Sequence, residues 1–202
     1  MSNDGIIALT WNRIRLLKES PVGMVGAFLV LFWVFVAIFA PLISPYDPNA
    51  NDMEALMSPP TGAHWLGTDN SGRDILSRLL HGARLSLMIG LVSVLLSALP
   101  GVALGLTAAF FPKFIGTMIM RFMDIILAFP QLLLALVALT TVGPQSWLII
   151  AIVAFTTIPR IARITRGAAV PVVERDFIGA AEALGESRLR IITRELLPNV
   201  TG

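Results

Sequence analysis

The 202-residue chain contains no cysteine and only two histidines. Without cysteine the protein forms no disulfide and holds no metal through thiolates, although the redox compartment stays open. The two histidines, His64 and His81, are too far apart in the sequence to form a local zinc motif. We therefore expect neither a metal ion nor a cofactor.

The chain also lacks the residues of an ATP-hydrolysing enzyme. It has no Gly-x-x-x-x-Gly-Lys-Ser/Thr loop, which would cradle phosphates, and no pair of carboxylates placed for acid–base chemistry. The protein is therefore not expected to be an enzyme. An isoelectric point near 9.7 could indicate a nucleic-acid partner, but the basic residues flank apolar stretches. That placement is the ordinary topology signal of a membrane protein, so we expect no nucleic acid.

Charged residues form only 14% of the chain and hydrophobic residues 55%, which is typical of a protein embedded in lipid. A helix needs about 20 apolar residues to cross a bilayer. Four stretches meet this requirement, and we predict an all-α polytopic membrane protein with spans at residues 22–43, 85–111, 114–142 and 146–166. The first stretch is too long for a signal peptide, so we interpret it as a retained anchor.

The positive charges predict the orientation of these spans. Arg13, Arg15 and Lys18 precede the first span, which places residues 1–21 in the cytoplasm. Residues 44–84 then form an external loop, and residues 167–199 form a cytoplasmic loop rich in arginine.

Several spans carry residues that bend helices or let them approach closely. Pro100, Pro130 and Pro159 predict local bends, and Gly101 and Gly105 form a small-xxx-small pair. These features suit either plain packing or a moving pathway. Asp124 is the one acid well inside an apolar run, and we expect it to pair with Arg121 rather than to relay protons.

The external loop divides into two parts. Residues 44–51 and 58–62 are rich in turn-forming residues and predict an extended surface segment. Behind them, Ile75, Leu76, Leu79 and Leu80 fall at helical spacing and predict a short amphipathic helix on the outer membrane face. Its capping candidates are Asp69, Asn70 and Ser71, and Trp65 suits the interface as an aromatic anchor.

The cytoplasmic loop has the composition of a soluble helical hairpin. Residues 170–185 predict a helix with a small-residue face, which Gly185 ends in a left-handed turn. A second helix from Ser187 should point Leu189, Ile192 and Leu196 inward and Arg188 and Arg190 outward, and should stop at residues 197–199. Such a hairpin suits insertion into a groove on a partner, or else caps the helix bundle in water.

Two motifs resemble a known family. The runs Ala180-Ala-Glu-Ala-Leu-Gly185 and Arg190-Ile-Ile-Thr-Arg-Glu-Leu-Leu-Pro-Asn199 resemble the EAA loop of ABC importer permeases. The run from Leu66-Gly-Thr-Asp-Asn-Ser-Gly-Arg-Asp74 to Ser86, with Ala40-Pro-Leu-Ile-Ser-Pro-Tyr-Asp-Pro48, resembles the dipeptide/oligopeptide/nickel permeases in particular. The resemblance covers the chain from about Ser20 to Asn199.

The resemblance implies two groups of site residues. Those expected to couple the chain to an ATPase are Ala180, Ala181, Glu182, Ala183, Leu184, Gly185, Arg188, Arg190, Glu195 and Pro198. Of these, Glu182, Leu184, Gly185, Arg188 and Arg190 are expected to transmit the force. The external-loop signature comprises Gly67, Thr68, Asp69, Gly72, Arg73 and Asp74.

The chain departs from the family pattern in two places. Glu195 stands where family members commonly have a histidine. The family also continues through two further membrane helices after the EAA loop, so the resemblance implies that residues 200–202 begin the first of these helices, whereas this sequence stops at Gly202. The last two spans are therefore expected to be absent, in a fragment or a truncated product.

The resemblance implies a type I ABC importer permease that carries dipeptides, oligopeptides or nickel chelates inward by alternating access. The expected partners are a second permease subunit in a heterodimer, two ATPase subunits, an external substrate-binding protein and the lipid bilayer of a prokaryotic inner membrane. The alternatives are a secondary transporter or channel driven by an ion gradient, which would need more buried ionisable groups, and a membrane scaffold without transport.

Overall fold

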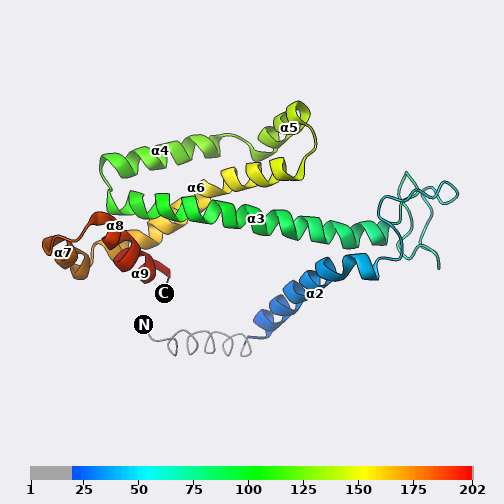
Figure 1. The fold of residues 1–202 in the computed structure, drawn as a ribbon, viewed down its shortest axis with the longest axis horizontal. Coiled ribbons are helices and arrows are strands. Elements are labelled where there is room, and N and C mark those ends of the chain that lie inside the picture. Colours follow the sequence, from blue (N-terminus) through cyan, green and yellow to red (C-terminus); the bar gives the residue numbers. More distant parts are fainter. Residues whose placement is uncertain (1–19, 202) are drawn as a thin grey trace. The chain divides into compact units, whose positions relative to one another are not determined.

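The computed structural model describes residues 20–201 (Figure 1). Residues 1–19 lie outside this range, and with them Arg13, Arg15 and Lys18, from which the cytoplasmic N-terminus is predicted. Between residues 20 and 201 the secondary structure is helical apart from one isolated antiparallel bridge between Thr68 and Asp74, so the all-α prediction is confirmed. The described residues form two compact units, which meet in the sequence between Met88 and Ile89.

The first unit begins with helix α2 (Pro21–Ile43). The side chain of Ser20 caps it by accepting a hydrogen bond from the Gly23 N–H at 3.2 Å. Most of its large apolar side chains are exposed, which suits a helix surrounded by lipid. Residues 44–74 follow as an irregular loop.

Helix α3 (Ile75–Phe110) runs without a break from the first unit into the second. The prediction of a separate amphipathic helix before a span starting at residue 85 is therefore wrong. No proline stands between Leu80 and Leu85, and the single glycine there, Gly82, costs a helix only about 1 kcal/mol, so the helix that starts at Ile75 continues. The predicted cap is also wrong, since Asp74 and not residues 69–71 accepts the Ser77 N–H, at 2.8 Å.

The second unit contains α4 (Phe114–Ala128), α5 (Gln131–Val142) and α6 (Ser146–Val173). Phe129 and Pro130 separate α4 from α5, and the chain bends by 68° between them. The bend predicted at Pro130 is confirmed, and it divides the span predicted over residues 114–142 into two helices, because Pro130 has no N–H to continue the helix. Within residues 20–201, three helices are long and apolar enough to cross a membrane, or four spans are present if this pair counts as one.

Glycines let α3 and α6 pack closely in the second unit. A Cβ added at Gly101 would lie 2.8 Å from the Ile161 Cβ, and one at Gly105 would lie 2.6 Å from the Ala162 carbonyl oxygen. Only residues without a side chain fit at this separation. The predicted small-xxx-small contact is confirmed.

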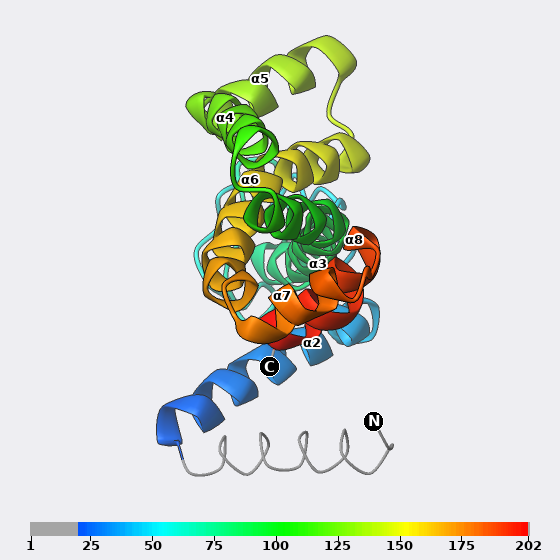
Figure 2. The same ribbon diagram turned by 90° about the vertical axis from the view of Figure 1, so that its left-hand side faces the viewer.

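The chain after α6 forms short helices that pack against the ends of α3 and α6 (Figure 2). These are α7 (Asp176–Ala183), α8 (Arg188–Arg190), the π-helix η1 (Ile191–Leu196) and α9 (Leu197–Thr201). The helix predicted over residues 170–185 is wrong, because α6 itself reaches Val173 and the chain turns at Glu174 and Arg175 before α7.

The predicted end of the last helix at residues 197–199 is also wrong, since α9 continues through Pro198. The Leu197 N–H bonds to the Ile192 carbonyl, five residues back, so the turn before Pro198 is wider than an α-turn. In an α-turn the proline ring would press on the carbonyl four residues earlier. The wider turn explains how the helix passes the proline.

Candidate functional site

The first candidate site is the hairpin, defined as residues 176–190. Gly185, at φ 78°, ends α7 in a left-handed turn. The Gly185 N–H bonds to the Glu182 carbonyl at 3.0 Å and the Glu186 N–H bonds to the Ala181 carbonyl at 3.1 Å. These two bonds define a Schellman motif, so the predicted turn at Gly185 is confirmed.

One side of the hairpin, together with the π-helix η1 that follows it, is fixed in the core of the second unit. Ile178 of α7 and Ile191 and Leu196 of η1 are buried against Leu106 of α3 and Ala169 of α6. Burying an aliphatic side chain of this kind stabilises a protein by about 1.5–3 kcal/mol. The hairpin is therefore held rigidly on two long helices.

The other side of the hairpin leaves apolar side chains uncovered. Leu184 is 84% exposed and Leu189 is 72% exposed. The predicted inward direction of Leu189 is wrong, because the π-helix places Ile191 and Leu196, five residues apart, on the buried side instead. Two exposed leucines on a rigid turn are suited to docking against another protein.

The other predicted coupling residues surround this surface. Ala180, Glu182, Ala183 and Arg190 are exposed, and Ala181 is partly buried against the core. The Arg188 guanidinium lies 5.2 Å from the centre of the Phe111 ring, a cation–π contact that fixes its position. Glu195 and Pro198 lie further along, in η1 and α9. The structure therefore brings residues 180–190 together around one turn.

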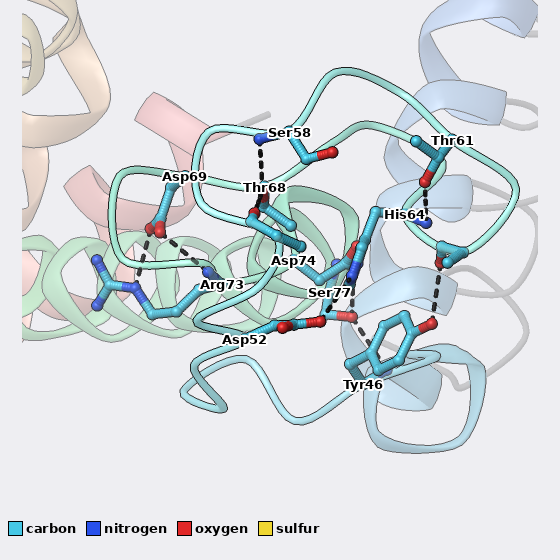
Figure 3. A network of polar contacts seen from close by, with 12 residues as sticks. Tyr46, Asp52, Ser58, Thr61, His64, Thr68, Asp69, Arg73, Asp74 and Ser77 are labelled. Atoms are coloured by element: carbon cyan, nitrogen blue, oxygen red, sulfur yellow. Dashed lines mark hydrogen bonds and ion pairs between the residues drawn. The ribbon is translucent and has the colours of Figure 1, made fainter.

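The second candidate site is the loop, defined as residues 44–74 (Figure 3). Two of its signature residues are glycines with left-handed backbones, Gly67 at φ 77° and Gly72 at φ 75°. A Cβ at Gly67 would lie 2.4 Å from the Ser58 carbonyl oxygen, and one at Gly72 would lie 1.9 Å from the Asp52 carbonyl oxygen. Both positions require glycine for conformation and for space.

The polar signature residues bond within the loop. The Thr68 hydroxyl accepts the Ser58 N–H at 2.9 Å and donates to the Ala55 carbonyl. The Asp69 carboxylate accepts the Ser71 N–H at 2.8 Å and the Arg73 Nε–H at 2.9 Å. Desolvation alone would raise the pKa of Asp69, but the N–H groups of Arg73 and Ser71 and the Arg73 guanidinium hold this pKa below its ordinary value.

A buried polar cluster joins the loop to the first turn of α3. His64 and Asp74 are 7% and 2% exposed, and the His64 Nδ1 lies 3.0 Å from the Asp74 carboxylate. Asp74 also accepts the Ser77 hydroxyl at 2.7 Å, and the Ser77 hydroxyl accepts the Tyr46 N–H at 3.2 Å. Figure 3 shows these side chains converging at the base of the loop.

Two opposing effects act on the Asp74 carboxyl. Desolvation raises its pKa, but hydrogen bonds from Ser77 and the contact with His64 lower it more, so the pKa of Asp74 lies below its ordinary value. In the sequence, Asp74 stands out only as part of the external-loop signature, and His64 only as a candidate zinc ligand. The His64–Asp74 contact has no local periodicity to reveal it, because it closes a loop of irregular backbone.

The charged pair in the second unit also differs from the prediction. The Arg163 Nη2 of α6 lies 2.5 Å from the Asp124 Oδ1 of α4. The prediction that Asp124 pairs with Arg121 is therefore wrong. The ion pair links two helices that pack side by side, which a pattern within one helix does not reveal. In residues 20–201 no three His, Asp or Glu side chains are grouped so that they could hold a metal ion.

Taken with the apolar helices, these sites define a multi-pass membrane protein with one self-bonded loop and one exposed hairpin. The model of the family "binding-protein-dependent transport system inner membrane component" matches residues 101–201, half of the chain. The chain belongs to this family. The model of the N-terminal TM domain of oligopeptide transport permease C matches residues 9–60.

Curated relatives agree with this assignment. The chain is 43% identical over 180 residues to the di/tripeptide transport system permease protein DppC of Pseudomonas aeruginosa, covering 86% of the chain and 59% of the relative. It is 35% identical to the probable D,D-dipeptide transport system permease protein DdpC of Escherichia coli, covering 92% and 62%. The dipeptide transport system permease protein DppC of Bacillus subtilis is 32% identical, covering 97% and 61%. The chain thus spans about six-tenths of the length of these relatives.

Proposed function

We propose that the chain is the permease subunit of an ATP-driven importer that carries dipeptides or oligopeptides inward by alternating access. The family membership supports this proposal, and so do the three relatives, each named as a permease of a dipeptide or tripeptide transport system. They favour it over a transporter driven by an ion gradient. The chain itself hydrolyses no ATP, and two ATPase subunits supply the energy.

The hairpin is the docking site for an ATPase subunit. The observation that carries this role is the exposure of Leu184 and Leu189 on a turn whose opposite side is fixed in the core. Glu182, Arg188 and Arg190 surround the leucines and provide charges that set the register of a partner. Because Ile178 and Ile191 contact α3 and α6, a push on Leu184 or Gly185 moves both long helices.

The proposed topology places the hairpin in the cytoplasm and the loop on the outer side of a prokaryotic inner membrane. The N-terminus is then cytoplasmic. A second permease subunit completes the pathway, and an external substrate-binding protein delivers the peptide to the outer face. The loop, held by its own hydrogen bonds, offers that protein a fixed surface.

The docking role is tested by Gly185→Val in the complete transporter. A β-branched residue strains strongly at φ 78°, whereas Asn tolerates this conformation, so Gly185→Asn is the matched control. We expect Gly185→Val to lower both ATPase co-purification and peptide uptake at least tenfold and Gly185→Asn to leave most of each. Undiminished co-purification and uptake in Gly185→Val would contradict the docking role.

A further inference from the structure

A cavity of about 420 Å³ lies between α4 and α6 of the second unit. Its lining residues are Met120 of α4 and Arg163, Arg166, Gly167, Val170 and Pro171 of α6. Two arginines on one wall make it a positively charged cavity, and the proposed coupling role assigns it no task.

The two arginines differ in what they already bind. Arg163 is paired with Asp124. The Nε of Arg166 is buried and donates to no partner among residues 20–201. A buried donor without a partner costs about 1–3 kcal/mol. A guanidinium offers several donors in one plane and matches the oxygens of a phosphate group.

The rest of the lining is apolar and leaves room. Apart from its chain neighbours and the nearby backbone of its own helix, no described atom lies within 4 Å of where a Cβ would stand on Gly167. Met120, Val170 and Pro171 present hydrocarbon beside the arginines, and Ile164 of the same helix is exposed. A free inorganic anion needs no such walls, whereas a phospholipid has both a phosphate and hydrocarbon chains.

We propose that this cavity binds the headgroup phosphate of an anionic phospholipid, with Arg166 as the main donor. The proposal rests on the proposed topology, which places the second half of α6 at the cytoplasmic membrane surface. Basic pockets between membrane helices on that side are suited to anionic headgroups. Asp124 weakens the attraction of the site for a phosphate, because its carboxylate already pairs with the Arg163 guanidinium.

The test measures lipid association and not transport, so that its failure is distinguishable from failure of the proposed function. The protein is placed in nanodiscs of phosphatidylcholine with phosphatidylglycerol, and spin-labelled lipids report its preference for phosphatidylglycerol. Arg166→Gln should lower this preference about fivefold, the effect of one cation near the surface. Gly167→Leu changes no charge but fills the cavity, and it should lower the preference to a similar extent.

Asp124→Asn is expected to change the lipid preference in the opposite direction. It frees Arg163 and should raise the preference for phosphatidylglycerol, whereas mere damage to the α4–α6 contact would lower it. The matched controls are Arg175→Gln, an exposed arginine outside the cavity, and Gly90→Leu, another helical glycine with open space. Both should stay within about twofold of the unmodified protein, well inside the fivefold effect of one cation.

Three results would overturn the proposal. The first is an unchanged preference in Gly167→Leu. The second is an equal loss in Arg175→Gln and Arg166→Gln, which would show a general effect of surface charge. The third is Arg166-dependent binding of inorganic phosphate with no change in lipid preference, which would assign the site to the free anion. If Arg166→Gln does not fold, Gly167→Leu and Asp124→Asn still decide.

Discussion

The loop and the hairpin both turn on glycines with left-handed backbones, but they use them in opposite ways. In the loop, Gly67 and Gly72 let the chain pack closely against its own carbonyl groups, and the polar signature residues form hydrogen bonds with one another and with neighbouring residues. In the hairpin, Gly185 has open space around it, and Leu184 beside it faces outward. Small and polar signature residues therefore hold the loop together through its own contacts, whereas in the hairpin they leave apolar side chains exposed for docking.

The largest expected difference comes from adding one methyl group to each type of turn. Gly72→Ala brings a Cβ within 1.9 Å of the Asp52 carbonyl oxygen, in addition to the strain of φ 75°. We expect a loss of more than about 3 kcal/mol in the stability of the loop. Gly185→Ala meets only the strain and should cost about 1 kcal/mol. Thermal unfolding in detergent, with proteolysis to locate the change, measures both, and equal effects would contradict the comparison.

The polar cluster of the loop should be the next most sensitive. Asp74→Asn removes the buried carboxylate beside the His64 Nδ1, leaving His64 only the more distant Asp52 carboxylate at 3.7 Å from its Nε2, and weakens the first turn of α3. We expect a loss of about 2 kcal/mol, because buried hydrogen-bonding groups lose charged partners. Glu54→Gln, at an exposed position of the same loop, is the control and should change little. A neutral outcome for Asp74→Asn would show that the cluster does not hold the loop.

Acid should loosen the loop while leaving the hairpin turn intact. The pKa values of Asp69 and Asp74 are both lowered from their ordinary value of 3.8 by the folded loop. Their stabilisation is therefore present above pH 3.8 and is lost as the pH falls through the lower folded values. Cleavage of the loop by pepsin, followed from about pH 5 to about pH 2, should rise below the ordinary value. Asp74→Asn should reduce this dependence, and a loop that opens first on raising the pH would contradict the sign.

The smallest change in stability is expected on the exposed side of the hairpin. Leu184→Ala removes a side chain that contacts little of the protein, so the free energy of unfolding should change by less than about 0.5 kcal/mol. Leu196→Ala removes a fully buried leucine and should cost about 2–5 kcal/mol. The free energies of unfolding of the two variants show whether a leucine is exposed to a partner or packed in the core. A Leu184→Ala variant as unstable as Leu196→Ala would place Leu184 in the core.

The sequence predicted features that depend on a single residue or a local pattern. Gly185 predicts the left-handed turn after α7, and Pro130 predicts the bend between α4 and α5. Gly101 and Gly105 predict the close contact of α3 with another helix. Contacts between distant segments could not be predicted in this way, so Asp124 received the wrong partner and the bond between His64 and Asp74 was missed. Leu189 was misplaced because η1 departs from the α-helical period on which the prediction depended.

The central claim is that the Leu184 side of the hairpin meets an ATPase in the cytoplasm. The absence of cysteine makes a direct measurement possible, because Leu184→Cys introduces the only thiol of the chain. In intact cells, a membrane-impermeant maleimide should spare this cysteine and label Trp65→Cys in the loop, and a short thiol-to-amine cross-linker should join Leu184→Cys to an ATP-hydrolysing subunit. Labelling of Leu184→Cys from outside, or no cross-link to any such subunit, would contradict the account.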